Sequence, residues 1–368
     1  MLKYGLFKLT RKKERASDWI ILIDFKVQSG SQKCFIVLGV RLSELMEKKK
    51  NRENFCLTHE DMEPLRIELM EKSSGVRVAE ILEEVSLEIG PAMQLIADHG
   101  GDVNKGTKIY CEAHKETINT YDITHKLACL LKNELKNDKI WKRIITHTND
   151  SKQKTKQSSE ACLSPPRQTE KARFMNVDIQ IDWLKDMVSL LNNEFPEFLD
   201  ANKVKDKLGW ILRYKNVIRK YTEIIAIVRE SRNLIRNEGL RRYSYIDLFK
   251  LLRKKFSDKL SSRAFGFAKK VIEFLKSEGS RIGIGDILLG SSEVIESLLG
   301  KYKPIEQRTK ATKSITPCIL SIAAMVGKNT VQMVSDALQT ITMKMIKGWK
   351  ELLIGKSDLA KRRELFQN

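Results

Sequence analysis

The chain has 368 residues, of which 42% are hydrophobic, enough for one large domain or two ordinary domains with a real core. Lys and Arg number 67 and Asp and Glu number 47, which gives a formal charge of +20 and an isoelectric point near 9.6. This composition excludes a disordered tail. It favours a polyphosphate partner such as nucleic acid, although a basic surface can also be merely well solvated.

No segment of the sequence is typical of a membrane span or a secretory signal. The longest apolar run, near Ile319–Val326, is far shorter than the ~20 residues that a spanning helix needs. Lys residues interrupt the N-terminal segment too often for the apolar core of a signal peptide. We therefore expect no membrane association and a cytoplasmic, nucleoid-associated protein.

The six cysteines are widely spaced and include no Cys-x-x-Cys pair, which is typical of a reducing compartment. One group, formed by Cys111, His114, His125 and Cys129, has a spacing that could hold zinc. Cys129 also lies in an apolar helical run, where a free cysteine behaves as a small core residue. Burial is the stronger interpretation of this group.

Apolar runs in the first part of the chain predict alternating strands and helices. We expect strands at 19–24, 33–39, 65–70, 92–98 and 117–121, and helices at 76–88, 104–114 and 124–135. A turn at 28–31 joins the first two strands into a hairpin. With right-handed crossovers, this order predicts an α/β fold with an RNase H-like, mixed five-stranded sheet.

The remainder of the chain is predicted to be helical. A polar segment at 147–171 indicates a linker or exposed loop. Long helical patterns near 177–194, 202–237 and 243–278 indicate a large all-helical insertion, and a helical tail occupies 316–367. We predict three parts: 1–145, the first part of the catalytic core; 146–285, the linker and helical insertion; and 286–368, the helix of the third catalytic acid and the C-terminal helices.

Two carboxylates are expected at the C-terminal edge of this sheet. Asp24 and Asp98 each close an apolar run, and the strands that carry them are predicted to be parallel neighbours. Carboxylate oxygens are preferred ligands of Mg²⁺. Two Mg²⁺ or Mn²⁺ ions about 4 Å apart can activate a hydroxyl and stabilise the leaving oxyanion of a phosphodiester. The sequence therefore predicts a metal-dependent site for DNA cleavage and strand transfer.

A third acid is expected from a helix near 293–303. Ser292 can cap this helix, and its apolar residues form a buried stripe. Glu296 and Lys303, seven residues apart, share the face opposite this stripe, so the acid can bind metal while the cation holds a DNA phosphate. Glu293 is the competing acid, because the first turn of a helix favours a negative charge.

Four stretches of the chain carry a family resemblance, which extends from about Asp18 to the C-terminus. The stretches are Trp19–Asp24 with Gln32–Gly39, Ile96–Gly101, Tyr121–Lys126, and Glu296 with six residues before Lys303. In their order and spacing they resemble the DDE transposases of bacterial insertion sequences, within the retroviral-integrase-like superfamily. The resemblance implies a triad of Asp24, Asp98 and Glu296, with a helical insertion before the Glu.

The resemblance also implies contacts with DNA. It places the Asp122-x-x-His125 motif near the DNA, and we assign Lys303, Lys301 and His125 to DNA binding. A transposase must hold two transposon ends as well as target DNA, which favours a homodimer.

Two departures from the family pattern leave a second interpretation open. Many relatives carry a Tyr and an Arg where this chain has Leu289 and Ser292. Complete transposases usually place a DNA-binding region before the first catalytic strand, which here begins about eighteen residues into the chain, so we expect an N-terminal truncation. The alternative function is a catalytically inactive, transposase-derived nucleic-acid-binding protein.

Two basic runs, 11–15 and 48–52, can bind phosphates or can form solvated loops.

Overall fold

The computed structural model divides the chain into two compact units. It describes residues 1–29, 32–52, 54–70, 73–98, 100–167, 176–257, 259–308, 315–355 and 358–366. The first unit consists of Met1–Asp122, Arg236–Arg241 and Arg281–Asn368. The second unit consists of Ile123–Ile235 and Arg242–Ser280. The second unit is therefore inserted into the sequence of the first.

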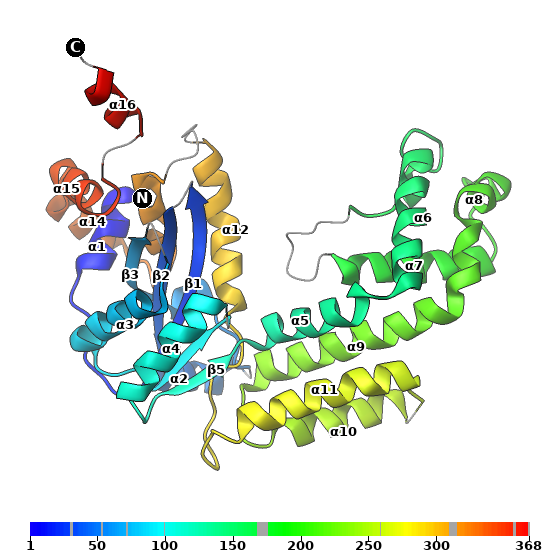
Figure 1. Ribbon diagram of the computed structural model, residues 1–368, viewed down its shortest axis with the longest axis horizontal. Helices are drawn as coiled ribbons and strands as arrows, with labels where there is room; N and C mark the ends of the chain where they lie inside the picture. Colours follow the sequence, from blue (N-terminus) through cyan, green and yellow to red (C-terminus); the bar gives the residue numbers. More distant parts are fainter. Residues whose placement is uncertain are drawn as a thin grey trace. The chain divides into compact units, whose positions relative to one another are not determined.

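A five-stranded mixed sheet forms the centre of the first unit (Figure 1). Its strands are β1 (Trp19–Ser29), β2 (Gln32–Arg41), β3 (Glu63–Met70), β4 (Gln94–Ala97) and β5 (Ile118–Tyr121). Their order is β3-β2-β1-β4-β5; β2 is antiparallel to β1 and β3, whereas β4 is parallel to β1 and β5. This order and these directions are those of the RNase H-like arrangement, so the predicted fold class is confirmed.

One expectation about β1 is wrong. We expected this strand to end at Asp24, but it continues to Ser29, and Asp24 lies opposite Ile36 of β2. The continuation is stabilised by the facing pair Phe25 and Phe35, whose ring centres are 4.8 Å apart. The predicted turn at 28–31 includes Gly30 and Ser31, which lie outside the described residues.

Helices cover both faces of the sheet. On one face lie α3 (Gly75–Ile89) and α4 (Gly101–Ala113), which bury an apolar layer with Ile21 and Ile23 of β1. The Ser74 hydroxyl accepts the Arg77 N–H and caps α3, which ends at Gly90 with a φ of +95°. A Cβ at Gly90 would lie 2.6 Å from the Ala16 carbonyl oxygen, so this close approach requires glycine.

The opposite face is covered by α12 (Glu293–Arg308) and α13 (Leu320–Ala324). Ile20 and Leu22 of β1 point into this layer because side chains alternate along a strand. Figure 1 shows α12 lying beside β1. Strands from the first part of the chain and helices α12 and α13 from its last part therefore pack into one core.

The N-terminal helix was not anticipated from the sequence. Helix α1 (Leu2–Thr10) packs against α13, α14 (Val331–Thr340) and α15 (Met343–Leu353). A Cβ at Gly5 would lie 2.0 Å from the Leu320 carbonyl oxygen, so α1 and α13 are in very close contact. The remaining elements of this unit are α2 (Leu42–Arg52), the 3₁₀ turns η1 (His59–Asp61) and η4 (Pro317–Ile319), and α16 (Asp358–Phe366).

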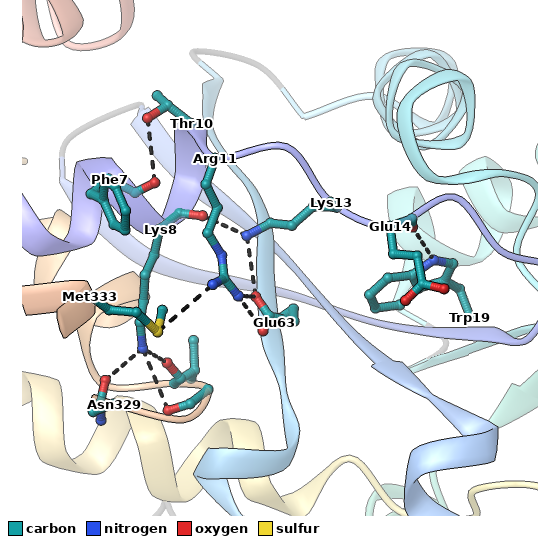
Figure 2. Close-up of polar contacts among 12 residues, drawn as sticks. Phe7, Lys8, Thr10, Arg11, Lys13, Glu14, Trp19, Glu63, Asn329 and Met333 are labelled. Carbon is teal, nitrogen blue, oxygen red and sulfur yellow. Dashed lines mark hydrogen bonds and ion pairs between the residues drawn. The ribbon is translucent and has the colours of Figure 1, made fainter. Parts of the chain in front are cut away.

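Two cations of the first basic run share one carboxylate within the fold. Arg11 donates two hydrogen bonds of 2.5 Å to the Glu63 carboxylate, and Lys13 lies 3.2 Å from it (Figure 2). In the second run, Lys48 pairs with the buried Asp61. Arg11, Lys13 and Lys48 therefore take part in contacts within the protein, which is neither of the two roles, phosphate binding or a solvated loop, that the sequence indicates for these runs.

The second unit is entirely helical in the residues described. Its elements are α5 (Ile123–Lys136), α6 (Lys139–Lys156), η2 (Ala161–Leu163), α7 (Val177–Asn192), α8 (Ala201–Leu208), η3 (Gly209–Tyr214), α9 (Lys215–Glu238), whose last three residues belong to the first unit, α10 (Ser244–Phe256) and α11 (Ser262–Gly279). The long pattern at 202–237 is interrupted by η3, and the pattern at 243–278 is a pair of helices.

The linker predicted at 147–171 is wrong over its first part, because α6 extends to Lys156. Asp138 caps α6 by accepting the N–H groups of Ile140 and Trp141. The buried residues beyond position 147 are Thr148, Ser151 and Thr155, so the helix carries no apolar signal there. Residues 168–171 of the predicted linker lie outside the described residues.

Candidate catalytic edge

The two predicted aspartates lie on adjacent parallel strands. Leu22 of β1 is in register with Ile96 of β4, so Asp24 and Asp98 each follow this pair by two residues. Pairing with β4 ends near this level, because β4 stops at Ala97 while β1 continues. Adjacent strands are about 4.8 Å apart, which brings the backbones of these two residues close to each other.

The side chains of both aspartates are partly exposed. A Cβ at Gly100, the residue before α4, would lie 3.5 Å from Oδ1 of Asp98. The Asp98 carboxylate is therefore near the N-terminus of α4, where the helix dipole favours a negative charge. His99, the next residue of the predicted motif, lies outside the described residues.

The segment leading into α12 is anchored to the start of β4 and to the end of β5. The buried Gln94 side chain accepts the Leu289 N–H at 3.0 Å and donates to the Leu289 carbonyl oxygen at 2.6 Å. Three residues later, the Ser292 N–H and hydroxyl donate to Oδ2 of Asp122 at 2.6 and 2.5 Å. Leu289 and Ser292, where many transposases have a Tyr and an Arg, thus hold the start of α12 through these hydrogen bonds.

Asp122 has a structural environment that the sequence did not reveal. It follows β5, is fully buried, and its N–H donates to the Ala97 carbonyl oxygen at 3.1 Å. We expected the Asp122-x-x-His125 motif to lie near DNA. No local signal in the sequence identifies this contact, because Asp122 and Ser292 are 170 residues apart.

Glu296 and Lys303 lie on one flank of α12, next to its buried stripe. This stripe contains Ile295, Leu298, Leu299 and Tyr302. Glu296 is half-buried and Lys303, seven residues later, is exposed. Residues seven apart point in nearly the same direction from a helix, so Glu296 and Lys303 share this flank, and their roles with metal and DNA stay predictions.

The competing acid lies elsewhere on the helix. Oε2 of Glu293 lies 3.8 Å from Nη1 of Arg236, so this carboxylate has a local cation. Seen down the helix axis, Glu293 lies away from the buried stripe, whereas Glu296 lies at its border. This difference favours Glu296 as the acid that faces the sheet edge.

Lys301 projects from the flank of α12 opposite Lys303. Its Nζ lies 2.9 Å from Nδ1 of His59. Burial lowers the pKa of His59, and the Lys301 charge lowers it further. The neutral imidazole can therefore accept a hydrogen bond from the Lys301 ammonium. Of the two predicted DNA-binding lysines on this helix, only Lys303 shares a flank with Glu296.

The remaining predicted site residue, His125, lies in the second unit. It occupies the first turn of α5 and is half-buried. Cys129 is in the same helix, whereas Cys111 and His114 belong to the first unit. His114 instead contacts Glu83, with 2.7 Å between Nε2 and Oε2, and stacks on Tyr110.

Carboxylates are suitable ligands for Mg²⁺ or Mn²⁺, and strand register brings two of them to neighbouring positions. Within the described part of the chain, no group of three or more His, Cys, Asp or Glu side chains is arranged to hold a metal ion. The donor chemistry of Asp24, Asp98 and Glu296 therefore fits such ions, but binding would require the side chains to converge further.

Comparisons with known proteins give likenesses to solved structures alone. The chain matches no protein-family profile, and no curated protein matches its sequence. Among solved structures, it is similar to a Drosophila P element transposase strand transfer complex, with a TM-score of 0.41 and 8% sequence identity, over 90% of this chain and 81% of that chain. The fold assignment above rests on strand order and direction.

Among the helices in the described ranges, none combines the length and apolar character needed to cross a bilayer.

Proposed function

We propose that this protein is a metal-dependent DNA strand transferase of the DDE type, which cleaves transposon ends and joins them to target DNA. The observation that carries the proposal is the register between β1 and β4 in an RNase H-like sheet, because Asp24 and Asp98 each follow the paired residues Leu22 and Ile96 by two positions. The anchored start of α12 supports the assignment of Glu296 as the third acid.

In this proposal Asp24, Asp98 and Glu296 would hold two Mg²⁺ or Mn²⁺ ions. When bound, the ions supply an activated hydroxyl nucleophile and stabilise the charge on the leaving oxygen. Lys303 would hold a phosphate of the DNA backbone as it passes Glu296. The formal charge of +20 favours association with DNA over the whole surface.

The proposal is tested with purified protein and duplex DNA that carries the inverted repeats flanking its coding sequence. We expect cleavage in Mg²⁺ or Mn²⁺ that is abolished by a chelator and is at least about 100-fold slower in Asp98→Asn. The matched control is Asp102→Asn, because Asp102 accepts a hydrogen bond from Ser73 instead. Cleavage at the wild-type rate by Asp98→Asn would refute the assignment.

A second candidate function is favoured by the absence, among the described residues, of a ready three-ligand group. It is a nucleic-acid-binding protein derived from a transposase but without catalytic activity. Calorimetric titration with Mn²⁺ separates the candidates. If the protein is an enzyme, wild type is expected to release or absorb heat on binding Mn²⁺, and both Asp24→Asn and Asp98→Asn are expected to abolish that heat. If it only binds nucleic acid, wild type and the two variants are expected to give the same Mn²⁺ titration and to keep their affinity for DNA.

A further inference from the structure

A polar pocket lies beside β5, the edge strand of the sheet in the first unit. Its volume is about 730 Å³, which is within the range of sites that hold small molecules. Seven of its nine lining residues are polar or charged. The lining consists of Asn104, Lys108, Cys111, Glu112, Lys115, Thr117, Ile118, Asn119 and Arg281.

This pocket is separate from the candidate catalytic edge. It lies at the N-terminal end of β5, whereas Asp98 follows the C-terminal end of β4. Because β4 and β5 are parallel, these two places lie at opposite ends of the strands. The four lining residues from α4, at 104, 108, 111 and 112, share one face of that helix. The pocket is therefore a second candidate site, built by other side chains.

Three cations and one acid line the pocket, a net charge of 3 − 1 = +2. Arg281 donates a hydrogen bond from Nη1 to the Asn119 carbonyl oxygen, which holds it beside β5. Burial raises the pKa of the Cys111 thiol to about 11, and the nearby charges of Arg281 and Lys115 oppose this rise. In the described part of the chain, neither Lys108 nor Lys115 forms an ion pair. The lining therefore suits a dianion such as a phosphate monoester.

The Asn119 side chain adds a hydrogen-bond acceptor. Its Nδ2 donates to the Thr107 hydroxyl at 3.0 Å, and this hydroxyl donates to the Asn104 carbonyl oxygen at 3.2 Å. Because the single hydroxyl proton of Thr107 is used, the carboxamide must present its NH₂ group to Thr107. Oδ1 of Asn119 is left buried and accepts no hydrogen bond from the described residues. A ligand with a hydroxyl group can satisfy this atom.

The backbone of β5 adds a donor on the same side. The Ile118 N–H donates to the Met93 carbonyl oxygen at 3.0 Å, toward β4. Because successive residues of a strand alternate in direction, the N–H and carbonyl groups of Asn119 point away from β4. The hydrogen bond from Arg281 to that carbonyl oxygen lies on this open side. An anion there can gain a backbone donor as well as the cations.

We propose that this pocket binds a small sugar phosphate. The phosphate group lies against Lys108, Lys115 and Arg281. The sugar hydroxyls donate to Oδ1 of Asn119 and to the Glu112 carboxylate, which are both acceptors. A lining that is almost entirely polar suits a ligand that is polar on every side.

The lining is less suited to other phosphate compounds. None of the nine lining residues is aromatic, so a nucleotide base would find no ring on which to stack. Along the backbone of duplex DNA, phosphates alternate with deoxyribose that carries no free hydroxyl. The backbone therefore offers no donor to Asn119 or Glu112, and the Glu112 charge repels it.

Calorimetric titration of the full chain, without DNA or metal, tests the site. The probes are glucose 6-phosphate and glycerol 3-phosphate, compared with inorganic phosphate and glucose. We expect both esters to bind with a dissociation constant below about 1 mM and more tightly than inorganic phosphate, and glucose not to bind. Lys108→Ala and Lys115→Ala are expected to weaken both esters at least about tenfold. Lys50→Ala, at an exposed lysine of α2, is the control and should leave the affinity unchanged.

Glu112→Ala separates a hydroxyl-binding site from a purely electrostatic one. It is expected to strengthen binding of inorganic phosphate, because a like charge is removed, and to lower the preference for glucose 6-phosphate over inorganic phosphate at least about threefold. Circular dichroism melts establish that each variant is folded. Failure of both esters to bind, equal effects of Lys50→Ala and Lys115→Ala, or an unchanged preference in Glu112→Ala would overturn the proposal. So would displacement of bound glucose 6-phosphate by stoichiometric duplex DNA. None of these measurements depends on the proposed catalytic function.

Discussion

Ser292 donates two hydrogen bonds to one oxygen of the buried Asp122 carboxylate, one from its backbone N–H and one from its hydroxyl. Asp122 ends the first passage of the chain through the first unit, and Ser292 precedes α12 in the last passage. The contact therefore joins two segments that are about 170 residues apart. It fixes the start of α12, the helix that carries Glu296.

We predict that Ser292→Ala lowers the free energy of unfolding by about 1–3 kcal/mol, because a buried carboxylate loses one of its donors. The measurement is urea unfolding followed by circular dichroism. Ser297→Ala is the matched control, since Ser297 is exposed on the same helix and its replacement should change stability by less than about 0.5 kcal/mol. Equal effects of the two substitutions would show that the Asp122 contact contributes nothing.

The third acid can be identified by comparing two neighbouring glutamates. Glu296→Gln is predicted to slow cleavage by at least about 100-fold with little change in DNA affinity, because it removes a metal ligand. Glu293→Gln is predicted to leave the rate within a few fold of wild type, since Glu293 lies beside Arg236. Single-turnover cleavage assays measure both, and the opposite ranking would assign the role to Glu293.

Two lysines of α12 should differ in their contribution to DNA binding. Lys303→Ala is predicted to weaken binding uniformly across sequences and to reduce the slope of log K against log salt by about 1, as expected for one phosphate contact. Lys301→Ala should leave the slope unchanged, because Lys301 contacts His59. Fluorescence anisotropy over a range of salt concentrations makes the comparison, and equal slopes for the two variants would contradict it.

A buried lysine should make stability depend on pH. Nζ of Lys8 contacts the Val326 carbonyl oxygen and lies 2.6 Å from Oδ1 of Asn329, and burial lowers its pKa to about 8 (Figure 2). Between pH 8 and the ordinary value of 10.5, the unfolded chain binds the proton and the folded chain does not. Stability from this group therefore rises with pH across that window.

The measurement is the free energy of unfolding of wild type and Lys8→Met at pH 7.5 and pH 10. We expect the wild type to gain stability relative to Lys8→Met as the pH rises. Lys12→Met is the control, because Lys12 is exposed on the segment that follows α1. A difference between wild type and Lys8→Met that is independent of pH would show that Lys8 titrates normally in the folded protein.

The sheet could be predicted because its strands carry strong local signals. Unbroken apolar runs such as Trp19–Ile23 identify buried strands, and the rule of right-handed crossovers then leaves few possible orders. This reasoning was sufficient to make β1 and β4 parallel neighbours. It could not show that β1 continues past Asp24, because that extension depends on pairing with β2.

Other features depend on partners that are distant in the sequence. In the sequence, Arg11 and Lys13 are typical of a solvated charge run. Their partner in the structure is Glu63, about 50 residues later, which binds both of them. The second half of α6 buries small hydroxyl residues, so its periodicity is invisible to a hydrophobic pattern. The role of Asp122 was hidden in the same way by its distance from Ser292.

The layout of the core also constrains how the protein is made. On a ribosome, β1 to β5 emerge first, but α12 and α13, which cover the face containing Leu22, follow the roughly 160 residues that begin at Ile123. At about 5–20 residues per second, that interval lasts roughly 8–32 s. During this time the helices of the second unit can fold, while the sheet face that contains Leu22 stays uncovered until α12 and α13 have been synthesised.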